Sequence, residues 1–120
     1  MNYIEYEIGG KLRGFKLGLK FLGDVLSHFD TDIMGLGELM DKNPFATRPV
    51  ILYYAHLSSV QGKNQPVTFT QEDVMDWVDE MEGGISNDNV IQTVMLVLES
   101  VKRHIPTSDE PVKEDEAKKK

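Results

Sequence analysis

The sequence predicts a mainly helical α+β fold, in which an N-terminal β-hairpin precedes a compact bundle of four or five helices. Three observations lead to this prediction. Residues 3–8 alternate in polarity and are followed by a Gly-Gly pair, which is typical of a hairpin. From residue 19 to residue 105 the apolar positions recur with helical spacing. Residues 107–120 are almost devoid of apolar side chains. We therefore expect one domain over residues 1–106 and a disordered, charged tail over residues 107–120.

The hairpin follows from two short alternating runs. The first places Tyr3, Glu5 and Glu7 on one side of a strand and Ile4, Tyr6 and Ile8 on the other. A second extended run through Leu12, Phe15 and Leu17 begins after the glycines. Isolated two-stranded hairpins are marginally stable, so this one has to pack on helices. Its exposed edge could also pair with a neighbouring subunit, and we expect packing together with a contribution to self-association.

Apolar spacing then predicts three helices in succession. Leu22, Leu26 and Phe29 share one face of a helix over about residues 19–29. Asp32 could cap a short second helix, although the glycines at 35 and 37 weaken it. A long apolar helix, ending near Gly62, has two possible starts, at Asn43-Pro44 and at Thr47-Arg48-Pro49.

The clearest helix start lies at Thr70. Thr70 is a good N-cap, and Asp73 completes a capping box three residues later. Phe69 and Val74 are placed as a hydrophobic staple on either side of the cap. The apolar stripe of this acidic helix consists of Val74, Trp77, Val78 and Met81, and Gly83-Gly84 ends it.

A last helix is expected from residue 86 or 87 to Pro106, which stops it. Val90, Val94 and Val97 belong to its long apolar face, and Met95 and Leu96 widen that face. This width predicts a central helix that is surrounded on nearly all sides.

Composition restricts the class of function. The net charge is −7, and all but one unit of it belongs to residues 1–106. An acidic surface repels phosphate backbones, so we expect no nucleic acid as a partner. The chain lacks cysteine, which excludes disulfides and thiolate metal sites. It has neither an apolar window of membrane-spanning length nor a signal peptide, so we expect no membrane contact and a cytoplasmic location.

The sequence shows no arrangement of catalytic or metal-binding residues. The histidines at 28, 56 and 104 are isolated, and no nucleophile-base spacing is present. The segment from Asp30 to Asp41 imitates a calcium loop but has Met34 at position five of the loop and Asp41 instead of glutamate at position twelve. We therefore expect a protein that is not an enzyme and has no cofactor and no metal.

Candidate partner-binding residues come from two segments. Met75 flanks the apolar stripe of the acidic helix, where an adaptable methionine suits a binding surface, although ordinary core filling is the favoured interpretation of the methionines. Trp77 could anchor an interface, or it could belong to the core. The acidic residues Asp76, Asp79 and Glu80 cover the polar face, for which a solvated surface is the favoured interpretation. The remaining candidates, Tyr3 and Glu5, lie in the first strand of the hairpin.

The order of these segments resembles the tail assembly chaperones of long-tailed bacteriophages, prophages and gene-transfer particles. The turn region of the hairpin supplies Gly10, Lys11, Arg13, Phe15 and Gly18. An apolar helix over residues 52–57 follows, and the start of the acidic helix matches with Thr70, Glu72, Asp73 and Val74. The resemblance covers about residues 3–82.

The resemblance implies a function. Such chaperones bind the tape measure protein, a very long helical chain with exposed apolar surface, and keep it soluble. They also help to recruit the tail tube protein, act in the cytoplasm of the infected bacterial host, and are absent from the mature virion. A longer, frameshifted form is often made, with which the lysines at 118–120 are compatible. The alternative is a non-enzymatic, acidic helical adaptor or regulator that binds one host or phage protein.

Overall fold

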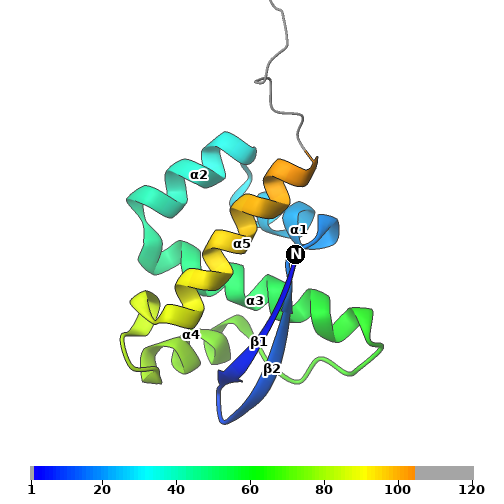
Figure 1. Ribbon diagram of the computed structural model, residues 1–120, viewed down its shortest axis with the longest axis vertical. Helices are drawn as coiled ribbons and strands as arrows, with labels where there is room; N and C mark the ends of the chain where they lie inside the picture. Colours follow the sequence, from blue (N-terminus) through cyan, green and yellow to red (C-terminus); the bar gives the residue numbers. More distant parts are fainter. Residues whose placement is uncertain (1, 105–120) are drawn as a thin grey trace, which may run out of the picture.

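The computed structural model describes residues 2–104 and confirms the expected fold class (Figure 1). The expected tail over residues 107–120 lies outside the described residues. The elements are β1 (Tyr3–Ile8), β2 (Lys11–Lys16), α1 (Leu19–Phe29), α2 (Ile33–Lys42), α3 (Pro44–Gly62), α4 (Gln71–Glu80), the short 3₁₀ helix η1 (Gly84–Ser86) and α5 (Asp88–His104).

The turn of the hairpin depends on its two glycines. Gly9 and Gly10 have φ angles of 62° and 86°, which residues with a Cβ rarely adopt. Two consecutive positive φ angles belong to the type I′ turn, whose twist matches that of the flanking strands. The antiparallel register pairs Ile8 with Lys11 at the turn and Tyr3 with Lys16 at the open end.

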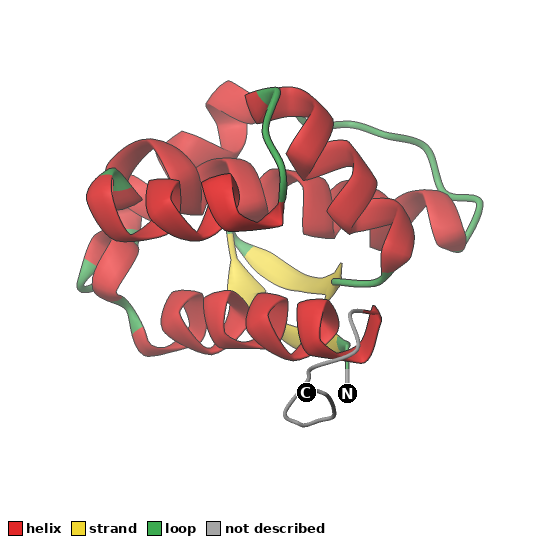
Figure 2. Ribbon diagram, turned by 90° about the horizontal axis from the view of Figure 1, so that it is seen from above, coloured by secondary structure: helices red, strands yellow, loops and turns green. Residues whose placement is uncertain are grey.

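The hairpin lies between helices and buries one face, whereas Glu5 and Glu7 on its other face are exposed. Figure 2 shows the two strands between one long helix, α5, and the remaining helices. On the α3 side, Phe15 is buried and its ring stacks on that of Tyr6, with 4.6 Å between the ring centroids. The Tyr6 hydroxyl forms a buried hydrogen bond of 2.9 Å with the Thr93 hydroxyl of α5, and burial raises the pKa of Tyr6. The hairpin therefore packs on helices as expected, whereas its part in self-association stays a prediction.

Helix α3 runs through the centre of the molecule. It begins at Pro44, so the first of its two possible starts is the correct one, and Pro49 lies inside it. Pro49 has no amide hydrogen to donate to the carbonyl of Phe45 one turn earlier. The buried side chains of α3 point in several directions, since it contacts the hairpin and every other α-helix.

Helix α4 starts as the sequence predicts. The Thr70 hydroxyl accepts a hydrogen bond of 3.1 Å from the Asp73 amide, and the Asp73 carboxylate accepts one of 2.9 Å from the Thr70 amide. Phe69 and Val74 are both buried, as the staple requires. The helix ends at Glu80, before the glycine pair.

The expected central position of the last helix is wrong. Helix α5 forms an outer layer, and Ile91, Met95 and Leu98 are 37%, 54% and 51% exposed. Its buried face consists of Val90, Thr93, Val97 and Ser100. The apolar sector of α5 is wider than the surface that covers it, so a stripe at spacing i, i+4, i+7 stays uncovered.

Candidate functional site

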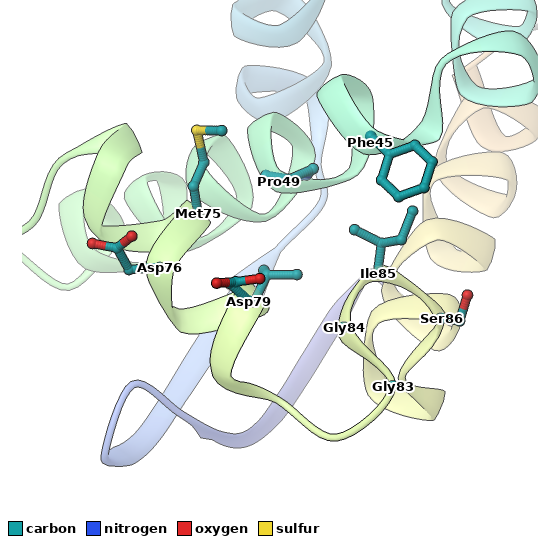
Figure 3. Close-up of a pocket in the computed structure, with 10 residues that line it drawn as sticks. Phe45, Pro49, Met75, Asp76, Asp79, Gly83, Gly84, Ile85 and Ser86 are labelled. Atoms are coloured by element: carbon teal, nitrogen blue, oxygen red, sulfur yellow. The ribbon is translucent and has the colours of Figure 1, made fainter.

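An open groove of about 540 Å³ lies between the start of α3, helix α4 and the turn around η1 (Figure 3). Its apolar wall consists of Phe45, Pro49, Met75, Val78 and Ile85. Phe45 is 74% exposed and Met75 is 52% exposed. Large apolar side chains with this exposure, gathered around one depression, are typical of a protein-binding surface.

Local structure holds this wall in place. The Asn43-Pro44 start puts Phe45 in the first turn of α3, beyond the residues that α3 buries. On the opposite side, Gly83 and Gly84 have positive φ angles, which allow the chain to turn sharply after α4. The Arg48 guanidinium then donates a hydrogen bond of 2.7 Å from Nη1 to the carbonyl of Ile85. This bond fastens the η1 turn to α3.

The rim of the groove is acidic. Asp76 and Asp79 of α4 line it, and both side chains are exposed. Within residues 2–104 neither carboxylate has an ion-pair or hydrogen-bond partner. An apolar wall beside two unpaired carboxylates suits a partner segment that is apolar and is flanked by lysine or arginine.

The structure separates the residues that the sequence singled out. Met75, Asp76 and Asp79 come together at the groove. Trp77 and Glu80 line a different depression, beside the Gly9-Gly10 turn. Helical geometry explains the division, because at about 3.6 residues per turn Trp77 and Glu80 project from a different sector of α4 than Met75, Asp76 and Asp79 do.

Trp77 fastens the hairpin to α4. The Arg13 guanidinium lies 3.8 Å from the centre of the indole ring, and the ring also packs against Phe69 and His56. A Cβ added at Gly9 would lie 2.6 Å from the indole, so the turn backbone touches the ring directly. These contacts place Trp77 in an intramolecular cluster outside the groove.

Tyr3 and Glu5 belong to another part of the surface. The Tyr3 hydroxyl donates a hydrogen bond of 3.0 Å to Glu5 and accepts one of 3.2 Å from Lys63, at the C-terminal end of α3. Neither residue lines the groove.

Sequence reasoning missed two residues of the groove, Phe45 and Ile85. Both stand outside any apolar repeat, so periodicity gives no signal for them. The placement of Phe45 directly after a proline helix start is the one local signal for a first-turn position.

His56 is a buried polar residue that the sequence did not single out. Its Nδ1 donates a hydrogen bond of 2.7 Å to the carbonyl of Gly14, which leaves Nε2 as the acceptor, 3.5 Å from Arg13 Nη1. Burial lowers the pKa of His56, and the charges of Arg13, Lys11 and Lys63 lower it further, against the Gly14 hydrogen bond. His56 is thus a neutral link between α3 and the hairpin.

Within residues 2–104, no group of three or more histidine and acidic side chains could hold a metal ion. In the segment that imitates a calcium loop, the Asp32 carboxylate accepts a hydrogen bond of 2.8 Å from the Gly35 amide and caps α2. Its role there is that of an N-cap.

Comparison with models of protein families, with characterised proteins and with solved structures gives no match to this chain. No helix in the described part of the chain has the length and apolar character needed to cross a bilayer.

Proposed function

We propose that this protein is a tail assembly chaperone that binds the tape measure protein, keeps it soluble and helps to recruit tail tube subunits. The observation that carries the proposal is the groove in which Phe45 and Met75 are exposed beside Asp76 and Asp79. The order of segments over residues 3–82, which resembles that family, supports it.

The groove suits the apolar face of a helix. Covering the exposed parts of Phe45 and Met75 removes apolar surface from water on both partners. This burial favours binding by about 25 cal/mol for each Å² of apolar surface. Methionine adapts its shape, so different turns of one long helix can be accepted. A contact of this kind is weak enough to be released when tube subunits replace the chaperone.

The outer stripe of α5 offers a second apolar contact, through Ile91, Met95 and Leu98. Two separate apolar surfaces on one chaperone raise its effective affinity for a partner long enough to reach both. A long helical chain with exposed apolar surface is such a partner.

The charge of the protein supports a holding function. Since the chain carries a net charge of −7, a tape measure protein covered by many copies would gain negative charge and repel other such complexes. The proposal places this activity in the cytoplasm of the infected bacterial host, before the mature virion forms. A homo-oligomer is compatible with it.

The direct test uses the tape measure protein encoded beside this gene. It is diluted out of denaturant with and without a molar excess of this chain, and light scattering and size-exclusion co-elution are measured together. We expect suppressed scattering and a shared elution peak. An unrelated acidic protein of similar size and net charge is the control. Equal aggregation in both samples with no shared peak would contradict the proposed function.

A further inference from the structure

We propose that a polar pocket between the hairpin and the C-terminal half of α3 binds a small oxyanion, such as a carboxylate or phosphate group. The pocket has a volume of about 280 Å³ and is lined by three cationic side chains, Lys11, Arg13 and Lys63. It does not share a lining residue with the apolar groove. This site is independent of the proposed chaperone function.

Arg13 is held in place before any ligand arrives. Its Nε donates a hydrogen bond of 2.9 Å to the carbonyl of Ile8, its Nη2 donates one of 3.2 Å to the carbonyl of Gly9, and its plane lies over Trp77. Both acceptors are neutral carbonyls, so these bonds orient the guanidinium without neutralising it, and the Asp73 carboxylate offsets its charge only from beyond ion-pair distance. A pre-oriented guanidinium with a free N–H group is the side chain best suited to an oxyanion.

The two lysines add charge from opposite walls. Lys11 extends from the start of β2, and Lys63 follows the end of α3, where its Nζ donates a hydrogen bond to the Tyr3 hydroxyl. Among residues 2–104 no carboxylate lies within ion-pair distance of Lys11, Arg13 or Lys63. Three like charges around one pocket repel one another, and a bound anion would relieve that repulsion.

The pKa of His56, which also lines the pocket, reflects the same excess of positive charge. All three cations lower its pKa, in addition to the effect of burial. Uncharged donors complete the lining, namely the hydroxyls of Ser59 and Thr68 and the amide of Gln65. Glu5 is the one carboxylate among the described residues that line the pocket, and its Oε2 accepts a hydrogen bond from Tyr3.

The dimensions of the pocket limit the ligand. A volume of about 280 Å³ accepts one carboxylate or phosphate group with its immediate substituents. The net charge of −7 disfavours a polyanion, because the rest of the surface would repel it. The pocket therefore suits one carboxylate or phosphate group better than a polyanion.

Trp77 allows a direct test, because it is the single tryptophan of the chain and lies against Arg13. The full chain is titrated with sodium phosphate and, in a second arm, with sodium acetate, while sodium chloride keeps the ionic strength constant. We expect a saturable change in tryptophan fluorescence with half-saturation at roughly 1–10 mM, as for a partly exposed charge cluster. The same anion should raise the midpoint of thermal unfolding, since it binds the native state.

The two arms distinguish phosphate from carboxylate as the oxyanion that the pocket prefers. A response to phosphate alone assigns the pocket to phosphate groups, and a response to acetate alone assigns it to carboxylates. Responses to both assign it to oxyanions in general. Each of these results supports the site.

Paired variants show whether the response belongs to this pocket. Lys11→Gln with Lys63→Gln should weaken anion binding at least tenfold. The matched control is Lys16→Gln with Lys42→Gln, which removes the same charge from exposed positions outside the pocket and should bind as the unchanged protein does. The proposal is overturned if neither anion gives a saturable fluorescence change or a higher unfolding midpoint, or if both double variants respond alike.

Discussion

Gly9 lies where a turn and an aromatic ring meet. Its φ angle of 62° already disfavours any side chain, and a Cβ there would lie 2.6 Å from the Trp77 ring. We expect Gly9→Ala to lower the free energy of unfolding by about 2–3 kcal/mol, because backbone strain adds to displacement of the indole.

Gly10→Ala is the matched control, because Gly10 has φ of 86° but no atom near the added Cβ. It should lower the free energy of unfolding by about 1 kcal/mol, because backbone strain acts alone. Urea unfolding followed by tryptophan fluorescence measures both variants. If both variants lose the same free energy of unfolding, the contact between Gly9 and Trp77 does not contribute to stability.

His56 should make stability depend on pH. Its pKa is lower in the folded state than in the unfolded chain, so the unfolded chain takes up a proton first as pH falls. The stabilisation is complete above the ordinary histidine pKa of about 6.5 and is lost as pH falls from there through the lower folded pKa. Urea unfolding between pH 5 and pH 8 measures this slope.

His56→Gln removes the titrating group, so the part of the slope due to His56 should disappear. His28→Gln is the control, because His28 is exposed and bonds to Tyr54 outside the pocket. If His56→Gln and His28→Gln have the same pH dependence of stability, the assignment of that slope to His56 fails.

At the scale of elements, α4 is the helix that its own sequence specifies most completely. The cap, the reciprocal bond of Asp73 and the buried staple all follow from the residues at 69–74. We expect Thr70→Ala to lower the free energy of unfolding by about 1 kcal/mol. Thr68→Ala, at an exposed position just before the cap, should change it by less than about 0.5 kcal/mol. A smaller effect at Thr70 than at Thr68 would contradict the role of the capping box.

Helix α5 shows what local sequence does not determine. Its apolar positions predict a helix correctly, but the number of sides that are covered depends on which elements pack against it. Only the three-dimensional arrangement reveals that the hairpin lies under α5 and that the described chain leaves Ile91, Met95 and Leu98 partly exposed. The same limit explains why α5 was expected at the centre.

For the whole molecule, the sequence predicts the order of elements and the three residues that α4 contributes to the groove from among the predicted binding residues. Met75, Asp76 and Asp79 share one amphipathic helix, so their pattern indicates a surface. Phe45 and Ile85 join them only because the chain turns sharply at Gly83 and Gly84 and because Arg48 bonds to the Ile85 carbonyl. Contacts between segments distant in the sequence cannot be read from periodicity.

The oxyanion pocket has the same origin. Lys11 and Arg13 are close in the sequence, but Lys63 reaches them through the packing of β2 on α3. A net charge of −7 conceals this local excess of positive charge, since composition averages over the whole surface.

Capture of the tape measure protein by groove variants of this chain tests whether the groove is the binding surface. The two proteins are co-expressed, and the amount of soluble tape measure protein that co-purifies with the tagged chain is measured. Phe45→Asp with Met75→Asp places charges in the groove and should reduce capture at least tenfold, because apolar anchors carry most of the energy of such contacts.

The matched control is Leu19→Asp with Met34→Asp, which alters residues that are 66% and 81% exposed and lie outside the groove. It should capture as much as the unchanged chain. If the groove variant folds and still captures the tape measure protein in full, the groove is not the binding surface and the account is contradicted.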